Sequence, residues 1–175
     1  MSEDDNERQR ILKARAVALA REPEQGAAEE SRIGIVEFLI ADERYAIESA
    51  YIGEVYPLKH LTPLPCTPAY VLGVINMRGK ILSVIDLRTF FDLPDRGLSD
   101  LNKVIVLHDG AMEFGVLADA VIAARWIPRS VLLPSLPTLT EIRAEYLMGV
   151  TEERLIVLDG GKLLSDRGII VHEEV

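Results

Sequence analysis

Residue types that carry out nucleophilic, acid–base or metal chemistry are few in this sequence, and they do not cluster. None of the three histidines stands at a ligand spacing from another, and none lies beside the single cysteine, Cys66. Cys66 occurs in a proline-rich stretch without a neighbouring positive charge that would favour the reactive thiolate, so we expect an inert side chain. The sequence therefore predicts neither a metal ion nor a cofactor.

Motifs for phosphate binding and for covalent catalysis are missing from the sequence. It contains no G-x-S-x-G nucleophile turn and no G-x-x-x-x-G-K-S/T phosphate loop. Asp86, Asp119 and Asp159 end or follow apolar runs, where capping a turn is a simpler role than acid–base catalysis. Gly160-Gly161 is likewise explained by a turn. We predict no catalytic residue and no enzyme.

Composition narrows the class of protein further. The chain has 175 residues, a formal charge of −9 and 49% apolar residues, which predicts one domain or two small ones with a shared core. An acidic chain without a dense Lys/Arg cluster is not expected to bind nucleic acid. No apolar run is long enough to span a membrane, so we expect no membrane insertion. A single cysteine fits a reducing, cytoplasmic location.

Residues 1–32 are predicted to form an N-terminal helical extension. Leu12, Ala16 and Leu19 follow one another at helical spacing, and residues 26–31 have the composition of a linker. Two interpretations stay open at this point: a solvated tail, or a helix that docks on the body of the protein or on a partner.

From Ile33 onward, short runs rich in Val, Ile and Leu alternate with turn residues, which is typical of a mostly β protein. Asp109-Gly110 gives a strong hairpin signal between two of these runs. A short helix is expected over residues 87–93, before Pro94. The predicted strands are 33–40, 44–48, 52–56, 70–76, 81–86, 103–108, 112–117, 121–127, 146–150 and 155–158.

The pattern of strands occurs twice. Residues 70–74, Y-V-L-G-V, resemble residues 146–150, Y-L-M-G-V, and each segment is followed by an apolar run that ends in aspartate. The upstream hairpins also correspond, with partners 68 to 76 positions apart. We predict two five-stranded barrels, about residues 33–100 and 101–168, followed by a tail at 169–175. Units of about 65 residues are small, so the two should bury apolar faces against each other.

Residues 73–88 read G-V-I-N-M-R-G-K-I-L-S-V-I-D-L-R. This segment resembles the central signature of CheW-like chemotaxis domains, G-x-x-N-L-R-G-x-I-x-P-V-x-D-L-R. The opening hairpin, T-P-A-Y at residues 67–70 and Y-L-M-G at residues 146–149 also resemble that family, so the resemblance covers about residues 33–165. Met77 replaces the usual leucine, Ser83 replaces the usual proline, and the N-terminal extension is longer than a minimal member needs.

The resemblance implies two five-stranded SH3-like β-barrels related by pseudo-two-fold symmetry. It also implies a non-enzymatic adaptor of a two-component system, which couples the cytoplasmic tip of a chemoreceptor to the regulatory domain of a CheA-type histidine kinase. That kinase domain is itself CheW-like, so pairing can continue into rings. The expected location is the cytoplasm, at receptor arrays on the inner membrane.

Site residues are carried over from the family by position. The kinase-binding residues implied are Val55, Tyr56, Leu72 and Gly73. The receptor-binding residues implied are Ile52, Glu54, Arg78, Val104 and Val121.

Structural roles remain open for these residues. Each of the three apolar receptor candidates could be an ordinary core residue, and a Glu54–Arg78 ion pair could be a structural bridge that fixes the turn at residues 77–79. Gly79 is expected to have a positive φ. Leu72 is expected to be exposed unless a partner covers it.

Two alternative functions stay open. The chain could be a CheW-like auxiliary adaptor of a non-motility pathway. It could also be a β-barrel peptide-binding module unrelated to chemosensing.

Overall fold

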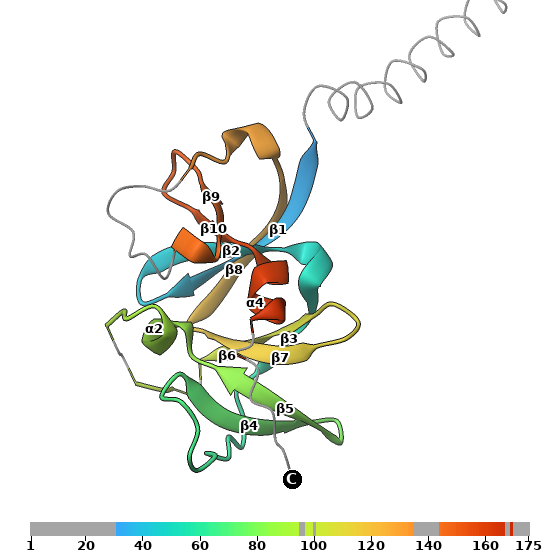
Figure 1. Cartoon of the computed structure of the whole chain (residues 1–175), viewed down its shortest axis with the longest axis vertical. Helices are drawn as coiled ribbons and strands as arrows, with labels where there is room; N and C mark the ends of the chain where they lie inside the picture. Colours follow the sequence, from blue (N-terminus) through green and yellow to red (C-terminus); the bar gives the residue numbers. More distant parts are fainter. Residues whose placement is uncertain (1–30, 95–96, 100, 135–143, 167–168, 170–175) are drawn as a thin grey trace, which may run out of the picture.

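The computed structural model describes residues 31–94, 97–99, 101–134, 144–166 and 169. The predicted N-terminal helix and the tail beyond Ile169 lie outside these described residues. Within them, ten strands form two five-stranded sheets, which confirms the mostly β fold (Figure 1).

The first sheet has the strand order β8-β1-β2-β10-β9 and the second has the order β3-β6-β7-β5-β4. The first contains β1 (Arg32–Ile40), β2 (Glu43–Glu48), β8 (Ala120–Pro128), β9 (Leu147–Val150) and β10 (Ile156–Leu158). The second contains β3 (Ile52–Pro57), β4 (Val71–Met77), β5 (Lys80–Ile85), β6 (Lys103–His108) and β7 (Glu113–Ala118). The short helices are α2 (Leu87–Phe90) and α4 (Gly160–Ser165), and the 3-10 turns are η1 (Ser49–Tyr51) and η2 (Arg129–Val131).

The two predicted halves do not fold as separate barrels. Each sheet combines the first two strands of one sequence repeat with the last three strands of the other: β1 and β2 join β8–β10, while β6 and β7 join β3–β5. The division into residues 33–100 and 101–168 is therefore wrong as a description of the sheets. The repeat itself is real, because the two strand orders become identical when repeat positions are compared.

Equivalent hydrogen bonds support the repeat. The backbone N–H of Asp86 donates to the Tyr70 carbonyl at 2.7 Å, and Asp159 donates to the Tyr146 carbonyl at the same distance. Each aspartate also caps the helix that follows it: the side chain of Asp86 accepts from the N–H of Arg88, and that of Asp159 from the N–H of Lys162. These aspartates thus have the turn-capping role expected from the sequence.

A short backbone bridge closes each sheet into a barrel. In the second sheet, Thr62 follows the edge strand β3 and pairs with Val74 in the opposite edge strand, β4, through two hydrogen bonds of 2.8 Å. In the first sheet, Leu133 follows β8 and pairs with Val150 in β9 through two bonds of 2.9 Å. Closure satisfies edge-strand groups that would otherwise be available to other chains.

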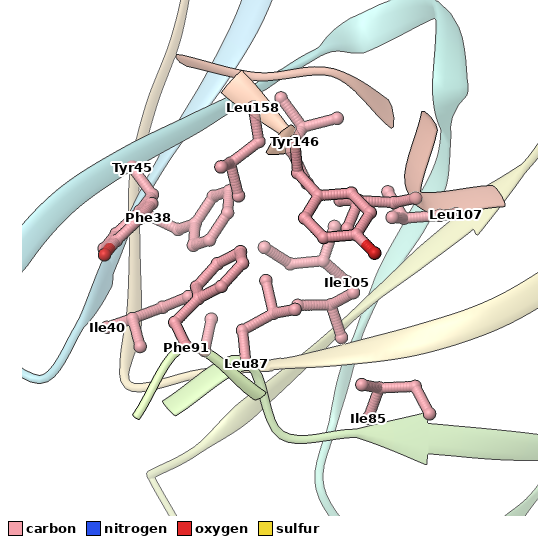
Figure 2. Packing of buried hydrophobic residues seen from close by; sticks show 14 of the residues in the cluster. Phe38, Ile40, Tyr45, Ile85, Leu87, Phe91, Ile105, Leu107, Tyr146 and Leu158 are labelled. Carbon is pink, nitrogen blue, oxygen red and sulfur yellow. The ribbon is translucent and has the colours of Figure 1, made fainter. Parts of the chain in front are cut away.

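Three clusters of buried apolar residues form the core. One fills the second barrel and another fills the first. The largest lies between the two sheets and takes side chains from both, with Phe38 and Leu158 from the first and Ile105 and Leu107 from the second (Figure 2). Hereafter it is called the shared core. Its existence confirms that the barrels bury apolar faces against each other, at about 1.5–3 kcal/mol of stabilisation for each fully buried large side chain.

Helix α4 and the end of the chain differ from the predictions. The sequence suggested a turn at Gly160-Gly161, but a helix starts there. The Asp159 cap and the burial of Leu163 and Leu164 in the shared core outweigh the poor helix propensity of glycine. Ile169 belongs to the predicted tail, but its side chain is 2% exposed and packs in the shared core.

None of the helices in the described part of the chain is long and apolar enough to cross a membrane.

Candidate binding surfaces

The described residues contain no group of three or more His, Cys, Asp or Glu side chains that could hold a metal ion. The aspartates considered for catalysis have structural partners. Besides the two helix caps, Asp119 accepts hydrogen bonds from the backbone N–H of Ala41 at 2.8 Å and from the Asn102 amide at 3.1 Å. Cys66 is a free, exposed thiol.

Ile52 and Val121, two of the receptor candidates, occupy matching places in the two barrels. Each lies on an edge strand, β3 or β8, and each is next to a register shift in the pairing with the neighbouring strand. Both side chains are half-buried and pack against the shared core. The structure therefore places them at the junction of the barrels, where part of each apolar surface is accessible.

Val104 differs from those two residues. It is fully buried in the core of the second barrel, where it pairs with Leu117 of β7 and with Tyr56 of β3. Of the two roles left open by the sequence, the structure supports core packing. Direct contact between this side chain and a receptor would require the barrel to open.

Glu54 and Arg78 form the expected ion pair. Arg78 Nη1 lies 3.3 Å from Glu54 Oε2, and the two side chains are 76% and 31% exposed. Water competes for such a pair, which contributes at most about 1 kcal/mol to stability. The other carboxylate oxygen, Glu54 Oε1, is buried and has no hydrogen-bond partner among the described residues. This pair holds Arg78 only weakly, so its guanidinium is available to a partner.

The turn that carries Arg78 is held by other interactions. Arg78 and Gly79 both have positive φ, 54° and 85°, as a two-residue hairpin loop of type I′ requires. The Asn76 side chain accepts a hydrogen bond from the N–H of Gly79 at 2.8 Å. The expectation for Gly79 is confirmed. The idea that the ion pair fixes the turn is unnecessary, because the backbone and Asn76 already do so.

The kinase candidates lie on the two edge strands of the second barrel. Val55 is 42% exposed, while Tyr56 and Leu72 are half-buried and both pack against the interior cluster of that barrel. They come from β3 and β4, the two edges that the Thr62–Val74 bridge joins. Leu72 was expected to be exposed without a partner. That expectation is wrong, because packing against the barrel interior covers much of its side chain.

Gly73 has a clear structural role. A Cβ atom at this position would lie 2.1 Å from the carbonyl oxygen of Thr62, so only glycine lets the bridging segment approach β4. In the other barrel, a Cβ on Gly149 would lie 2.7 Å from Leu132 Cβ. The Y-x-x-G-V repeat therefore marks the two places where a barrel closes.

The exposed apolar residues that the predictions did not include are found on β5 and β8, among other segments. Ile81 is 64% exposed beside the Arg78 turn, and Ile122 and Trp126 on β8 are 48% and 72% exposed. Alternation along β8 was a weak guide because the register shift beside Val121 changes which residues face outward. The only tryptophan of the chain was the available signal, since a large aromatic on an edge strand needs an explanation.

Tyr70 and Tyr146, the first residues of the two repeat motifs, share one electrostatic environment. Burial is the main cause that raises the pKa of each phenol, and the negative charge of Asp166 adds to the effect. The Tyr146 hydroxyl donates a hydrogen bond to Asp166. Both rings also contact Phe90, with centroids 5.0 and 5.2 Å away. The two tyrosines therefore join the barrels and are expected to stay protonated.

Comparison with known proteins identifies a family model and several relatives that match this chain. Residues 34–168 match the family model of the CheW-like domain. FrzA from Myxococcus xanthus is 34% identical over 133 residues, which are 73% of this chain and 82% of FrzA. The chemotaxis protein CheW from Treponema pallidum is 28% identical over 148 residues, or 81% of this chain and 87% of that protein.

A solved structure has the same fold. The scaffolding protein TtCheW from Thermoanaerobacter tengcongensis superposes with a TM-score of 0.67 and 29% sequence identity, covering 78% of this chain and 94% of its own.

Proposed function

The chain belongs to the CheW-like family, and on this premise we propose that it couples the cytoplasmic tip of a chemoreceptor to the regulatory domain of a CheA-type histidine kinase. Members of this family are scaffold or adaptor proteins of chemotaxis-type signalling rather than enzymes. Receptor coupling is the more specific step, and it depends on the surfaces of this chain. With family membership established, a peptide-binding module unrelated to chemosensing has no remaining support.

The observation that carries the proposal is the position of Ile52 and Val121. Both side chains are half-buried at the junction between the barrels and offer apolar surface on either side of it. A helical hairpin laid along such a junction would be recognised through apolar residues at positions i, i+3 and i+4. Arg78, which is exposed and weakly paired, supplies a cation for an acidic group on the same partner.

A separate surface is proposed for the kinase. Val55, Tyr56 and Leu72 present aliphatic and aromatic groups on the second barrel, and side chains of this kind form the centres of protein interfaces. Two different surfaces let one adaptor hold receptor and kinase together. A contact below about 1,200 Å² would be weak alone, and repetition in an array or ring would add avidity.

Reconstitution tests this proposal. A receptor hairpin fragment and the CheA-type kinase from the same genome are mixed with the chain, and kinase phosphorylation and kinase binding are measured separately. The wild-type chain is expected to raise receptor-stimulated phosphorylation. Arg78→Ala is expected to reduce that stimulation more than it reduces kinase binding, because Arg78 is assigned to the receptor side.

Val121→Ser provides a second receptor-side variant, and Thr89→Ala, an exposed position on α2, serves as the control. Equal loss of stimulation and kinase binding in Arg78→Ala would indicate a folding role and contradict the receptor assignment. If the wild-type chain bound neither the receptor fragment nor the kinase, the coupling function would be rejected.

An auxiliary adaptor of a non-motility pathway is the second candidate. Some relatives of this chain are named chemotaxis proteins, whereas FrzA and PilI do not carry that name. FrzA is 34% identical, compared with 28% for the Treponema pallidum CheW. A gene deletion that leaves swimming chemotaxis intact but changes another output would favour this alternative.

A further inference from the structure

A partly apolar hollow of about 450 Å³ lies at the end of the first barrel, beside the edge strand β8. Trp126, Val131 and Leu133 line it and are 72%, 38% and 44% exposed. Its volume falls in the range that accommodates several side chains. The apolar part of this lining offers a contact surface for an apolar segment.

The N-terminal part of the chain enters the described structure at this hollow. The backbone N–H of Arg129 donates to the carbonyl of Ser31 at 2.8 Å, and Arg32 pairs with Pro128. Gly34 pairs with Trp126 itself. Figure 1 shows the start of β1 and the end of β8 at the same end of the molecule. Ser31 therefore lies beside the end of β8, the strand that carries the exposed tryptophan.

Residues 8–21 carry positive charges and apolar side chains. They contain five arginines and lysines and no acidic residue, in a chain whose net charge is −9. Leu12, Ala16 and Leu19 provide apolar groups at helical spacing. This combination suits a surface that offers both apolar side chains and carboxylates.

The charged residues that line the hollow are Arg125, Glu152 and Glu153, with a net charge of −1. Arg125, its lining cation, is held by Glu37 at 3.0 Å and by Glu153 at 3.3 Å. Glu152 also lines the hollow and forms no ion pair with any described residue. An approaching cation would thus meet the carboxylate of Glu152, which forms no ion pair within 4.0 Å with a described arginine or lysine.

The connecting chain is long enough for contact. Residues 22–30 can span up to about 30 Å when extended, so residues 8–21 can reach every part of the hollow. Because the two partners are on one chain, the effective concentration is in the millimolar range, and a weak contact is sufficient.

We propose that residues 8–21 dock in this hollow of their own chain, with Leu12 and Leu19 against Trp126 and with their cations facing Glu152. This assigns a role to the exposed tryptophan and to the N-terminal extension. The hollow is in the first barrel and the proposed kinase residues are in the second, so this proposal and the proposed function can fail separately.

Fluorescence tests the contact directly, because Trp126 is the only tryptophan in the chain. Leu12→Gln/Leu19→Gln in the full chain should shift the emission maximum to the red and increase acrylamide quenching. The matched control Ala14→Gln/Ala18→Gln changes positions on the other side of the predicted helix and should behave as the wild type. Glu152→Lys should reproduce the effect of the leucine variant by repelling the segment.

Three outcomes would overturn the proposal. In the first, Trp126 of the wild type is quenched as strongly as that of the leucine variant, so that nothing covers it. In the second, shielding of Trp126 disappears on dilution, which identifies a second copy as the occupant. In the third, shielding appears only when anionic lipid vesicles are added, which assigns the basic segment to a membrane surface.

Discussion

Arg88 and Asp86 form a two-pronged ion pair inside the protein. Nε and Nη2 of Arg88 each donate to a different carboxylate oxygen of Asp86 at 3.0 Å, and the side chains are only 2% and 4% exposed. Arg88 Nη1 also donates to the Gly97 carbonyl at 2.9 Å. The D-L-R end of the signature segment is therefore a structural device, which anchors α2 and the loop after it.

Removing the positive charge of Arg88 should lower the stability of the folded protein. Arg88→Met keeps much of the apolar volume but leaves Asp86 as a buried, uncompensated carboxylate, and the free energy of unfolding should fall by about 3–5 kcal/mol. Urea unfolding measures this loss. Arg78→Ala, which breaks the exposed Glu54 pair, is the control and should cost at most about 1 kcal/mol. Equal losses would contradict the difference in burial on which the prediction depends.

Gly73→Ala should prevent proper closure of the second barrel. The new Cβ would lie 2.1 Å from the Thr62 carbonyl oxygen, in addition to the strain of a positive φ. We expect a loss of at least about 3 kcal/mol in thermal or urea unfolding. Gly110→Ala introduces backbone strain alone, since nothing lies within 4 Å of its Cβ, and should cost about 1 kcal/mol. A milder effect at Gly73 than at Gly110 would show that the bridge is not tightly packed.

Val55 is a better probe of the proposed kinase surface than Leu72. Val55 is 42% exposed, so Val55→Asp should reduce stability by no more than about 1 kcal/mol. If the surface binds the kinase, affinity measured by calorimetry should fall at least about tenfold. Ile122→Asp, at 48% exposure on the other sheet, is the matched control and should keep the affinity. Unchanged affinity in Val55→Asp removes this surface from the proposal.

Alkaline pH should destabilise the chain through Tyr146. Its pKa is raised in the folded state, so the folded chain retains the phenol proton where the unfolded chain loses it. The stabilising contribution is therefore complete below the ordinary tyrosine pKa of 10.0 and is lost as pH rises above that value. Urea unfolding between about pH 8 and 11 should show this decline.

Tyr146→Phe has no phenol proton and should show a flatter alkaline decline. At neutral pH it should be less stable than the wild type by about 1 kcal/mol, because the hydrogen bond to Asp166 is lost. An alkaline slope identical to that of the wild type would assign the pH dependence to another group.

The candidate surfaces were predictable only in part. Correspondence of position with the family identified Glu54 and Arg78, and their ion pair is present. The exposure of Val104 and Leu72 was not predictable, because the sequence does not show whether an apolar residue on a strand faces the barrel interior or solvent. The hollow beside Trp126 depends on segments that are distant in sequence and meet only after folding.

The sequence by itself determined the local elements. Short apolar runs, the Asp109-Gly110 turn and the positive φ of Gly79 depend on neighbours within a few positions, so the strands and these two turns could be inferred from the sequence. Tertiary structure alone decided which strands share a sheet. Local preference allows the hairpin β1–β2 or the hairpin β6–β7 to pair with either β3–β5 or β8–β10. Burial of the shared core between the two sheets selects the arrangement in which each hairpin joins the three strands of the other repeat.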